Sequence, residues 1–461
     1  MACKVRLLPI LPVIWTILFS VHAEAVESKK NLTVAVLLPW TGTWPIGQRM
    51  GPAAAVAIDD INNNAALLPD HHLDFVWKDT GCSAREGMDV TMELYEELGE
   101  NLRVIIGPGC DAVCGPIGVL AASWNVPIVS WGCASSHLSN KDEYPTFVRT
   151  VGPFTKTGGL FVSLLKHFGW TRAAILASTQ QVWQTTSHAI KLALEDAGIA
   201  VAFFQSFDPG YVQMTERERA MHHDALETAK QKARILIFCA DGGDVREMLL
   251  MAADLGIVNG DYVFVVINFA PDAMLGENTW MGRDGRDDDA RKVFNGLLNV
   301  HVHTPLLEDW EVLEREVRYR MAGPPFNRGM QRYEKVDVYA AMLYDAVMLY
   351  AMALDDALRE GESEADGARV AQLMKGRTFD GVAGEVSIDE YGDRSPNYVI
   401  QNLQGSRFED IAEFATANKS LEMRDVDIVW AGGKTSPPID SPECGWDNDL
   451  CMDDSCEFIL L

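Results

Sequence analysis

The sequence predicts an α/β protein built from two doubly wound parallel-sheet lobes. Short apolar runs of strand length alternate with longer helical segments, an order typical of βαβ units. The alternation fills one block of about 120 residues and then a second block of about the same size, which indicates two similar domains. The chain has 461 residues, of which 48% are hydrophobic and 23% charged, ordinary values for packed cores.

The first block contains four expected strands and three expected helices. The run at 32–38 is apolar and ends at Pro39, as a buried strand would. Three asparagines at 62–64 stop the helix before them, and residues 86–98 carry apolar side chains three and four positions apart. The expected strands are 32–38, 73–77, 104–106 and 127–131, and the expected helices are 52–61, 86–98 and 112–123.

The second block repeats this order and is followed by a longer helix at 336–358. Two doubly wound lobes place a ligand at the carboxyl ends of their strands, in the crevice between them. The expected helices of this block are 156–168, 185–197, 224–232 and 245–255, and the expected strands are 173–177, 201–207, 235–239 and 262–267.

The first residues have the pattern of a secretory signal peptide. Lys4 and Arg6 precede an apolar run at 7–19, and small residues follow at Ala23 and Ala25. The run is too short to span a bilayer, and no later stretch is long enough. We expect residues 1–23 to be removed. The protein is then secreted or lies at the extracellular face of the plasma membrane, as a secreted form or as a membrane protein cut short before its membrane segment.

The formal charge of −27, from 39 basic and 66 acidic residues, argues against binding to nucleic acids and anionic lipids. No nucleophile elbow, dinucleotide fingerprint or P-loop is present, so we expect no catalytic residue and no organic cofactor. His71 with His72, and His301 with His303, lack a third ligand, and the acidic run 287–289 lacks calcium-loop spacing. We therefore expect no metal.

Nine cysteines and two glycosylation sequons agree with an exported chain. The sequons begin at Asn31 and Asn418, and both asparagines are expected to be glycosylated. The glycine-rich segment 107–110 has two interpretations: a tight turn from strand to helix, or a site where free amides hold a small anion.

Several motifs resemble the extracellular ligand-binding domain of natriuretic peptide receptors and receptor guanylyl cyclases, in the ANF receptor family. The resemblance extends from Asn31 to about Cys451. The motifs are 31–39 (NLTVAVLLP), 51–54 (GPAA), 107–110 (GPGC), 124–127 (WNVP), 141–144 (KDEY) before Arg149, Trp280 with Asp284, Gly285, Asp287 and Ala290, 379–384 (FDGVAG), 388–389 and 392–394, and 442–448 (PECGWDN).

The resemblance implies a type I periplasmic-binding-protein-like fold, with two lobes joined by three crossovers near Val151, Thr304 and Arg377. Lobe 1 would comprise 31–151 and 304–377, lobe 2 would comprise 152–303 and 378–435, and 436–461 would be a juxtamembrane tail. The chain would bind a natriuretic-like peptide hormone as a homodimer. It would have no enzyme activity of its own, and it would signal towards cGMP only in a full-length receptor.

The resemblance also implies a chloride held near Gly109 and Cys110, with the hydroxyl of Thr80. The family's middle disulfide would join Cys239 to a cysteine near Val182, which is absent, so Cys239 is expected to be unpaired. Cys456 could form an interchain bridge or stay free. The expected disulfides are Cys82–Cys110 and Cys444–Cys451, with the additional Cys114 and Cys133 able to pair with each other.

Glu143 and Trp183 fall near family positions that contact the peptide. Ala84 and Ala112 stand where the classical receptors have an acid and an aromatic, so the ligand can differ from the natriuretic peptides. Two other classes remain open. In an amino-acid receptor, hydroxyls such as those of Ser135 and Ser136 would grip a ligand carboxylate. In a secreted decoy, the binding domain would have no effector.

Overall fold

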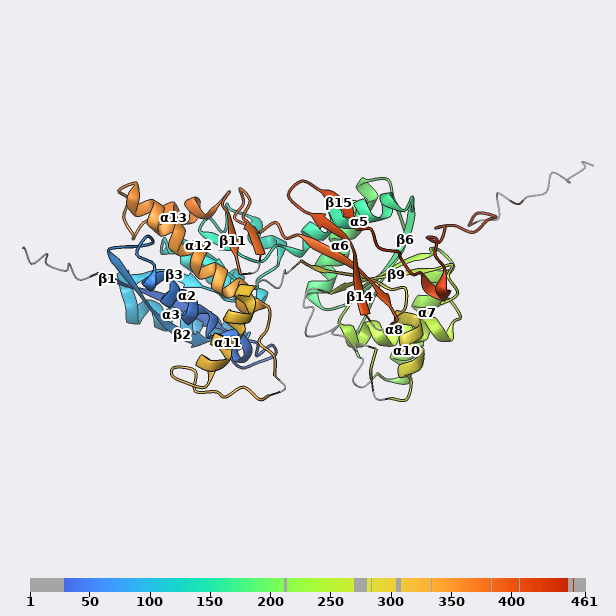
Figure 1. Cartoon of the computed structure of the whole chain (residues 1–461), viewed down its shortest axis with the longest axis horizontal. Helices are drawn as coiled ribbons and strands as arrows, with labels where there is room; N and C mark the ends of the chain where they lie inside the picture. Colours follow the sequence, from blue (N-terminus) through green and yellow to red (C-terminus); the bar gives the residue numbers. More distant parts are fainter. Residues whose placement is uncertain are drawn as a thin grey trace, which may run out of the picture.

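The computed structural model contains two α/β lobes that lie side by side (Figure 1). It describes residues 29–446 and 451, apart from 211–213, 269–279, 283, 304–307, 333, 383 and 406. The expected signal peptide at 1–23 and Cys456 lie outside the described residues. Across the described ranges, no helix is both long enough and apolar enough to cross a membrane.

Lobe 1 is built on a five-stranded parallel sheet with the strand order β2-β1-β3-β4-β5. Side chains of β1 alternate between two cores: Val36 and Leu38 reach one, and Ala35 and Leu37 reach the other. Burial on both faces explains the continuous apolar run at 32–38. The strands are β1 (Lys30–Leu38), β2 (His71–Asp79), β3 (Leu102–Ile106), β4 (Ile128–Ser130) and β5 (Phe147–Arg149).

Helices cover both faces of this sheet. α3 and α4 pack over the core that contains Leu37, whereas α2, α11, α12 and α13 pack over the core that contains Leu38. α3 begins after Ser83, whose hydroxyl accepts a hydrogen bond from the Glu86 amide. The helices are α1 (Gly47–Met50), α2 (Ala53–Asn63), α3 (Ala84–Leu98), α4 (Asp111–Ser123), α11 (Glu308–Met321), α12 (Tyr339–Arg359) and α13 (Gly367–Met374), with short 3-10 turns at η1 (Gly99–Asn101) and η2 (Ser136–Ser139).

Lobe 2 contains an eight-stranded sheet with the order β15-β14-β13-β10-β9-β8-β6-β7. β6 to β10 are parallel, which confirms the doubly wound pattern, but β13 to β15 are antiparallel. The lobe is therefore mixed and not wholly parallel, because successive strands joined by short turns need no crossover helix. The strands are β6 (Arg172–Ser178), β7 (Ala200–Phe207), β8 (Ile235–Cys239), β9 (Val263–Asn268), β10 (Leu298–Val302), β13 (Tyr398–Gln404), β14 (Arg407–Ala415) and β15 (Ser420–Met423).

Two cores again flank this sheet. α5 and α6 cover one face, and α7, α8 and α10 cover the other. A reciprocal capping box starts α7: the Thr215 hydroxyl accepts from the Glu218 amide, and the Glu218 carboxylate accepts from the Thr215 amide. The helices are α5 (Thr157–His167), α6 (Gln181–Asp196), α7 (Glu216–Lys230), α8 (Gly242–Asp254) and α10 (Asp287–Phe294), with 3-10 turns at η3 (Phe154–Lys156) and η4 (Ala431–Gly433).

The third crossing between the lobes lies further along the chain than the sequence suggests. β11 (Thr378–Gly381) and β12 (Gly384–Ser387) form a hairpin, and Val386 and Ile388 belong to the core of lobe 1. The chain therefore leaves lobe 1 after Ile388, and the boundary placed at Arg377 is wrong. The other two crossings follow β5 and β10, and 304–307 of the second lie outside the described residues.

The C-terminal tail is attached to lobe 2. The indole nitrogen of Trp170 donates to the carbonyl oxygen of Pro438 at 2.8 Å, and the Thr171 hydroxyl donates to Asp440 at 2.9 Å. Cys444 and Cys451 close a small loop at the end of this segment. Hydrogen bonds thus couple the position of the tail to that of lobe 2.

Candidate functional site

The turn at 107–110 follows β3 at the carboxyl end of the lobe 1 sheet, beside the point where the strand order reverses. Gly107 has a φ of +97°, and a Cβ there would lie 2.4 Å from the Leu37 carbonyl oxygen. A Cβ on Gly109 would lie 2.2 Å from the Trp131 ring. Neither position has room for a side chain, so both must be glycine. This supports the tight-turn interpretation.

One disulfide fastens this turn to its neighbour, and a second lies beside it. Cys82–Cys110 joins the turn to the segment after β2, and Cys114–Cys133 joins α4 to the loop after β4. Cys444–Cys451 is also present, so the structure contains each pair that the sequence suggested. Cys239 is free and fully buried, and burial raises the pKa of its thiol. A buried thiol of this kind is poorly reactive.

Thr80 lies two residues before the first of these disulfides and has the features of an anion ligand. Its side chain is fully buried, and its hydroxyl has no hydrogen-bond partner among the described residues. Among the residues that the structure describes, no backbone carbonyl accepts a hydrogen bond from the amides of Gly109 and Cys110. A buried hydroxyl and two amides at a helix start are donors that a small anion accepts from, so these three residues fit chloride.

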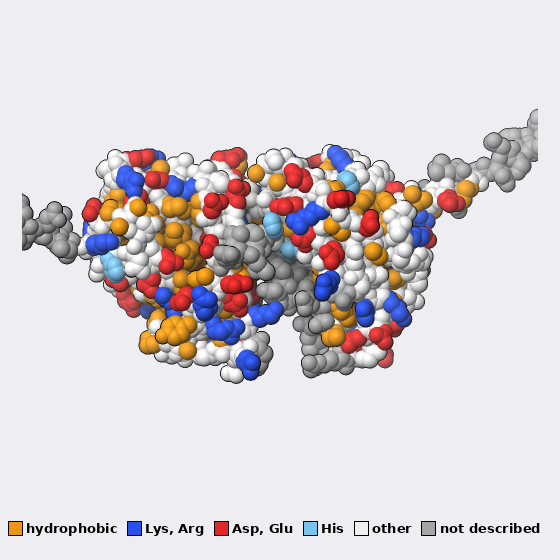
Figure 2. Space-filling view, viewed as in Figure 1, with side chains coloured by type: hydrophobic (Ala, Val, Ile, Leu, Met, Phe, Trp, Pro, Cys, Tyr) orange, Lys and Arg blue, Asp and Glu red, His pale blue; other side chains and the backbone are white. Residues whose placement is uncertain are grey.

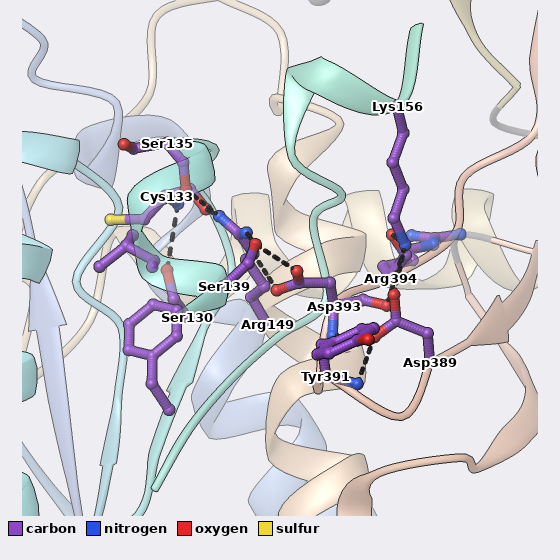
Figure 3. Close-up of polar contacts among 12 residues, drawn as sticks. Ser130, Cys133, Ser135, Ser139, Arg149, Lys156, Asp389, Tyr391, Asp393 and Arg394 are labelled. Carbon is purple, nitrogen blue, oxygen red and sulfur yellow. Dashed lines mark hydrogen bonds and ion pairs between the residues drawn. The ribbon is translucent and has the colours of Figure 1, made fainter. Parts of the chain in front are cut away.

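The loop after β4, which contains Ser135, is held by other parts of lobe 1 (Figure 3). Asp111 accepts a hydrogen bond from the Ser135 amide at 2.8 Å. Arg149 donates to the carbonyl oxygens of Cys133 and Ser135 at 2.9 and 2.8 Å. Burial raises the pKa of Asp111, although the Ser135 amide and Arg149 oppose that rise. An internal carboxylate thus already accepts from the backbone beside the Ser135 and Ser136 hydroxyls, which a ligand carboxylate would use.

Arg149 also joins the first crossing to the third. Its Nε lies 2.6 Å from Asp393 Oδ1, and both side chains are at most 3% exposed. Burial alone would raise the pKa of Asp393, but Arg149 and the Ser139 hydroxyl lower it overall. Lys156, just after the first crossing, lies 2.8 Å from Asp389. Figure 3 shows both pairs at the same junction.

The two expected peptide contacts have different surroundings. The Glu143 side chain is 41% exposed, and it lies 3.3 Å from His137 and accepts a hydrogen bond from Tyr144. Trp183 is 3% exposed in the core of lobe 2, and its indole nitrogen donates to Asp241 at 3.1 Å. Trp183 lies on α6 and its ring packs into the core of lobe 2, so in this conformation it presents almost no surface to a peptide.

The remaining sequence-derived positions are at the surface. Ser136 is exposed and Ser135 is half-buried, while Ala84 and Ala112 occupy the first turns of α3 and α4. Asn31 and Asn418 are both exposed, as glycosylation requires. Among the residues that the structure describes, no three His, Cys, Asp or Glu side chains converge as metal ligands.

The sequence analysis did not identify an apolar stripe on the outside of α3. Met88, Met92 and Tyr95 are 37%, 40% and 37% exposed, and the Tyr95 ring stacks on Trp124 with centroids 4.1 Å apart. The spacing of four and three residues within a helix was the available signal. The inward face of α3 uses Gly87, Thr91 and Leu94, so the apolar stripe lies on the outer face of the helix.

The Trp280 motif is organised by one buried cation. Arg246 on α8 donates to both carboxylate oxygens of Asp284 at 2.8 Å, to Asp287 at 3.0 Å and to the Trp280 carbonyl oxygen at 2.7 Å. The hydrogen bonds between Arg246 and Asp284 lower the pKa of the Asp284 carboxyl and raise the pKa of Arg246. The spacing of this motif therefore reflects a structural clamp.

Residues 49–406 match the receptor family ligand binding region of the ANF receptor family. The chain is 26% identical to atrial natriuretic peptide receptor 3 of Homo sapiens over 413 residues, which cover 87% of this chain and 74% of that protein. It is 28% identical to atrial natriuretic peptide receptor 2 of Rattus norvegicus over 450 residues. That alignment covers 93% of this chain and 41% of receptor 2, so the chain spans less than half of that relative.

Proposed function

Because this chain belongs to the ANF receptor family, we propose that it is the extracellular hormone-binding domain of a natriuretic-peptide-receptor-like guanylyl cyclase. It binds a peptide as a homodimer, and in a full-length receptor this binding raises cGMP production. The observation that carries the proposal is the match across the ligand-binding region, supported by relatives named as natriuretic peptide receptors over 87% and 93% of the chain.

The α3 stripe supports the dimer. Met88, Met92 and Tyr95 are apolar and partly exposed on the same helix face, and Val119 on the neighbouring α4 is 46% exposed. Burial of such side chains against a second copy stabilises a two-fold interface, in which each subunit contributes the same patch. Peptide binding then reorients the two protomers, provided that the contacts differ between the free and bound arrangements.

The charge distribution supports a cationic peptide ligand. A net charge of −27 steers basic peptides towards the domain. Glu143 offers an exposed carboxylate that pairs with a peptide arginine. Ala84 and Ala112 remove two contacts of the classical receptors, so the ligand is a related ringed peptide with different side chains at those positions.

The amino-acid alternative is less well supported. A free amino acid would bring its carboxylate to the loop that contains Ser135, where the carboxylate of Asp111 already accepts from the backbone. Two carboxylates at one site repel each other. Loss of the Asp111 hydrogen bond would be needed before such a ligand could bind.

Chloride is proposed as a structural anion of this domain, held by Thr80, Gly109 and Cys110. The orphaned Thr80 hydroxyl supports this assignment. The anion would accept hydrogen bonds from the amides at the turn and keep α4 in place beside the peptide site. We also propose a route for the signal: lobe 2 transmits its movement to the tail through Trp170 and Asp440.

A thermal-shift experiment on secreted residues 24–461 tests the proposal. The ligands are disulfide-ringed natriuretic-like peptides, their linear reduced forms, free L-amino acids, and chloride compared with gluconate. A rise in melting temperature with a ringed peptide at micromolar concentration is expected. A response to amino acids alone would replace the peptide-receptor proposal with the small-ligand alternative.

A further inference from the structure

A groove of about 390 Å³ lies on the outer face of lobe 1, between α2, α11, α12 and the β11–β12 hairpin. Its floor includes Met348 and Met352, one turn apart on α12, and Val312 of α11, which is 48% exposed. Figure 2 shows hydrophobic side chains gathered over α12 on this face, with acidic side chains beside them. The apolar floor is large enough to accept a few side chains but not a folded domain.

Carboxylates surround this floor. Asp60, Asp309 and Asp380 are exposed at the groove, and no Lys, Arg or His is among the described residues that line it. In the part of the chain that the structure describes, none of these three carboxylates forms an ion pair. Asp60 accepts a hydrogen bond from the Tyr344 hydroxyl at 2.9 Å, which fixes one edge of the groove.

We propose that this groove is a docking site for a basic amphipathic segment of another protein. Two or three apolar side chains of that segment would enter between Met348, Met352 and Val312. Its Lys or Arg side chains would meet Asp60, Asp309 and Asp380. This combination of an apolar seam and opposite rim charge is how helical segments are recognised in grooves.

Charge excludes two other occupants. A second copy would bring its own acidic rim against this one, and like charges across an interface are unfavourable. The tail of this chain is also unsuitable, because residues 447–461 contain acidic residues and no Lys or Arg. A basic partner is the occupant whose chemistry matches the groove.

The groove and the α3 stripe lie on opposite faces of the lobe 1 sheet. α2, α11 and α12 pack on the core that contains Leu38, whereas α3 and α4 pack on the core that contains Leu37. A partner in the groove therefore leaves the proposed dimer surface free. The docking proposal does not rest on the hormone-receptor function.

The test uses secreted residues 24–461 and a fluorescent model helix of about 14 Lys and Leu residues, with leucines at helical spacing. Binding is followed by fluorescence anisotropy at two salt concentrations. The variant Asp309→Asn/Asp380→Asn is expected to weaken binding about ten-fold. The matched control, Glu100→Gln/Asp425→Asn, removes the same charge from exposed sites elsewhere and is expected to change binding less than about two-fold.

A third variant tests the apolar floor. Met352→Lys is expected to weaken binding at least as much as the double Asp substitution, and thermal unfolding verifies that each variant is folded. If the groove variant and its control weakened binding equally, the peptide would be attracted only by the overall negative charge of the protein. That result would overturn the proposal. A change of sedimentation coefficient on substitution of the groove would assign it to self-association and overturn the proposal as well.

Discussion

Arg149 and Asp393 are 244 residues apart in the sequence, and their side chains form a buried ion pair with 2.6 Å between Nε and Oδ1. The pair connects the strand that leads out of lobe 1 with the segment that returns to lobe 2. Lys156 and Asp389 form a second pair at the same junction. Two of the three connections between the lobes are therefore fixed to each other, which restricts independent movement of the lobes.

Removal of one member of this pair should destabilise the domain strongly. Asp393→Asn is expected to lower the free energy of unfolding by about 3–5 kcal/mol, because the buried Arg149 loses its ion-pair partner. Chemical denaturation measures this loss. Asp425→Asn, an exposed substitution, is the control and should change stability by less than about 0.5 kcal/mol. Similar stability of the two variants would contradict the role given to the pair.

The same pair predicts a pH dependence. The pKa of Asp393 is lower in the folded state than in the unfolded state, so its contribution is complete above the unfolded pKa of about 4. That contribution disappears as the pH falls through the folded pKa. The difference in unfolding free energy between wild type and Asp393→Asn should therefore shrink below about pH 4. A difference that stays constant down to acid pH would argue against the ion pair.

Asp111 should exclude small carboxylates from the loop that contains Ser135. Asp111→Ala frees the Ser135 amide, so acetate is expected to raise the melting temperature of the variant by about 2–4 °C, and that of the wild type by less. Differential scanning fluorimetry in acetate and in gluconate measures the shift, with Asp425→Ala as the control. Equal shifts in all three proteins would show that Asp111 does not guard the loop.

The sequence predicted the alternation of strands and helices because the central strands are buried on both faces of each sheet. In β1, Leu37 and Leu38 belong to different cores, and such a strand reads as one apolar run. The strands β13 to β15 were not predicted. β14 carries Arg407, Glu409 and Glu413 among its apolar residues, a pattern that resembles a surface loop more than a buried strand.

Only those parts of the candidate site whose residues lie close together in the sequence could be predicted. The Gly107 and Gly109 turn and its disulfides were within reach, because their residue types and family motif identify them. The third crossing was misplaced because Val386 and Ile388 pack on lobe 1, which no local pattern shows. The partner of Arg149 is distant in the chain and cannot be read from spacing.

The additional disulfide Cys114–Cys133 should stabilise the domain more than the tail disulfide. It closes a separation of 19 residues, against 7 for Cys444–Cys451, and longer loops lose more freedom in the unfolded chain. Cys114→Ala/Cys133→Ala is expected to lower the free energy of unfolding by about 2–4 kcal/mol, with Cys444→Ala/Cys451→Ala as the comparison. Urea denaturation measures the loss of unfolding free energy in each variant. A larger loss on removal of Cys444–Cys451 would contradict the prediction.

The α3 stripe should be required for dimerisation. Met92→Glu places a charge in the centre of the stripe and is expected to weaken self-association by at least about ten-fold. Sedimentation velocity with saturating ringed peptide measures the dimer. Leu192→Glu on lobe 2 is a matched control, since Leu192 is also an exposed apolar residue, 59% exposed. A dimer that survives Met92→Glu but dissociates with Leu192→Glu would place the interface on lobe 2.

The stoichiometry of peptide binding tests the central claim most directly. Isothermal titration of residues 24–461 with a ringed natriuretic-like peptide should give one peptide per two chains, and Glu143→Gln should weaken the affinity by about ten-fold through loss of a charged pair. Absence of heat with every ringed peptide, or one peptide per chain with no dimer, would contradict the account of a peptide hormone held between two subunits.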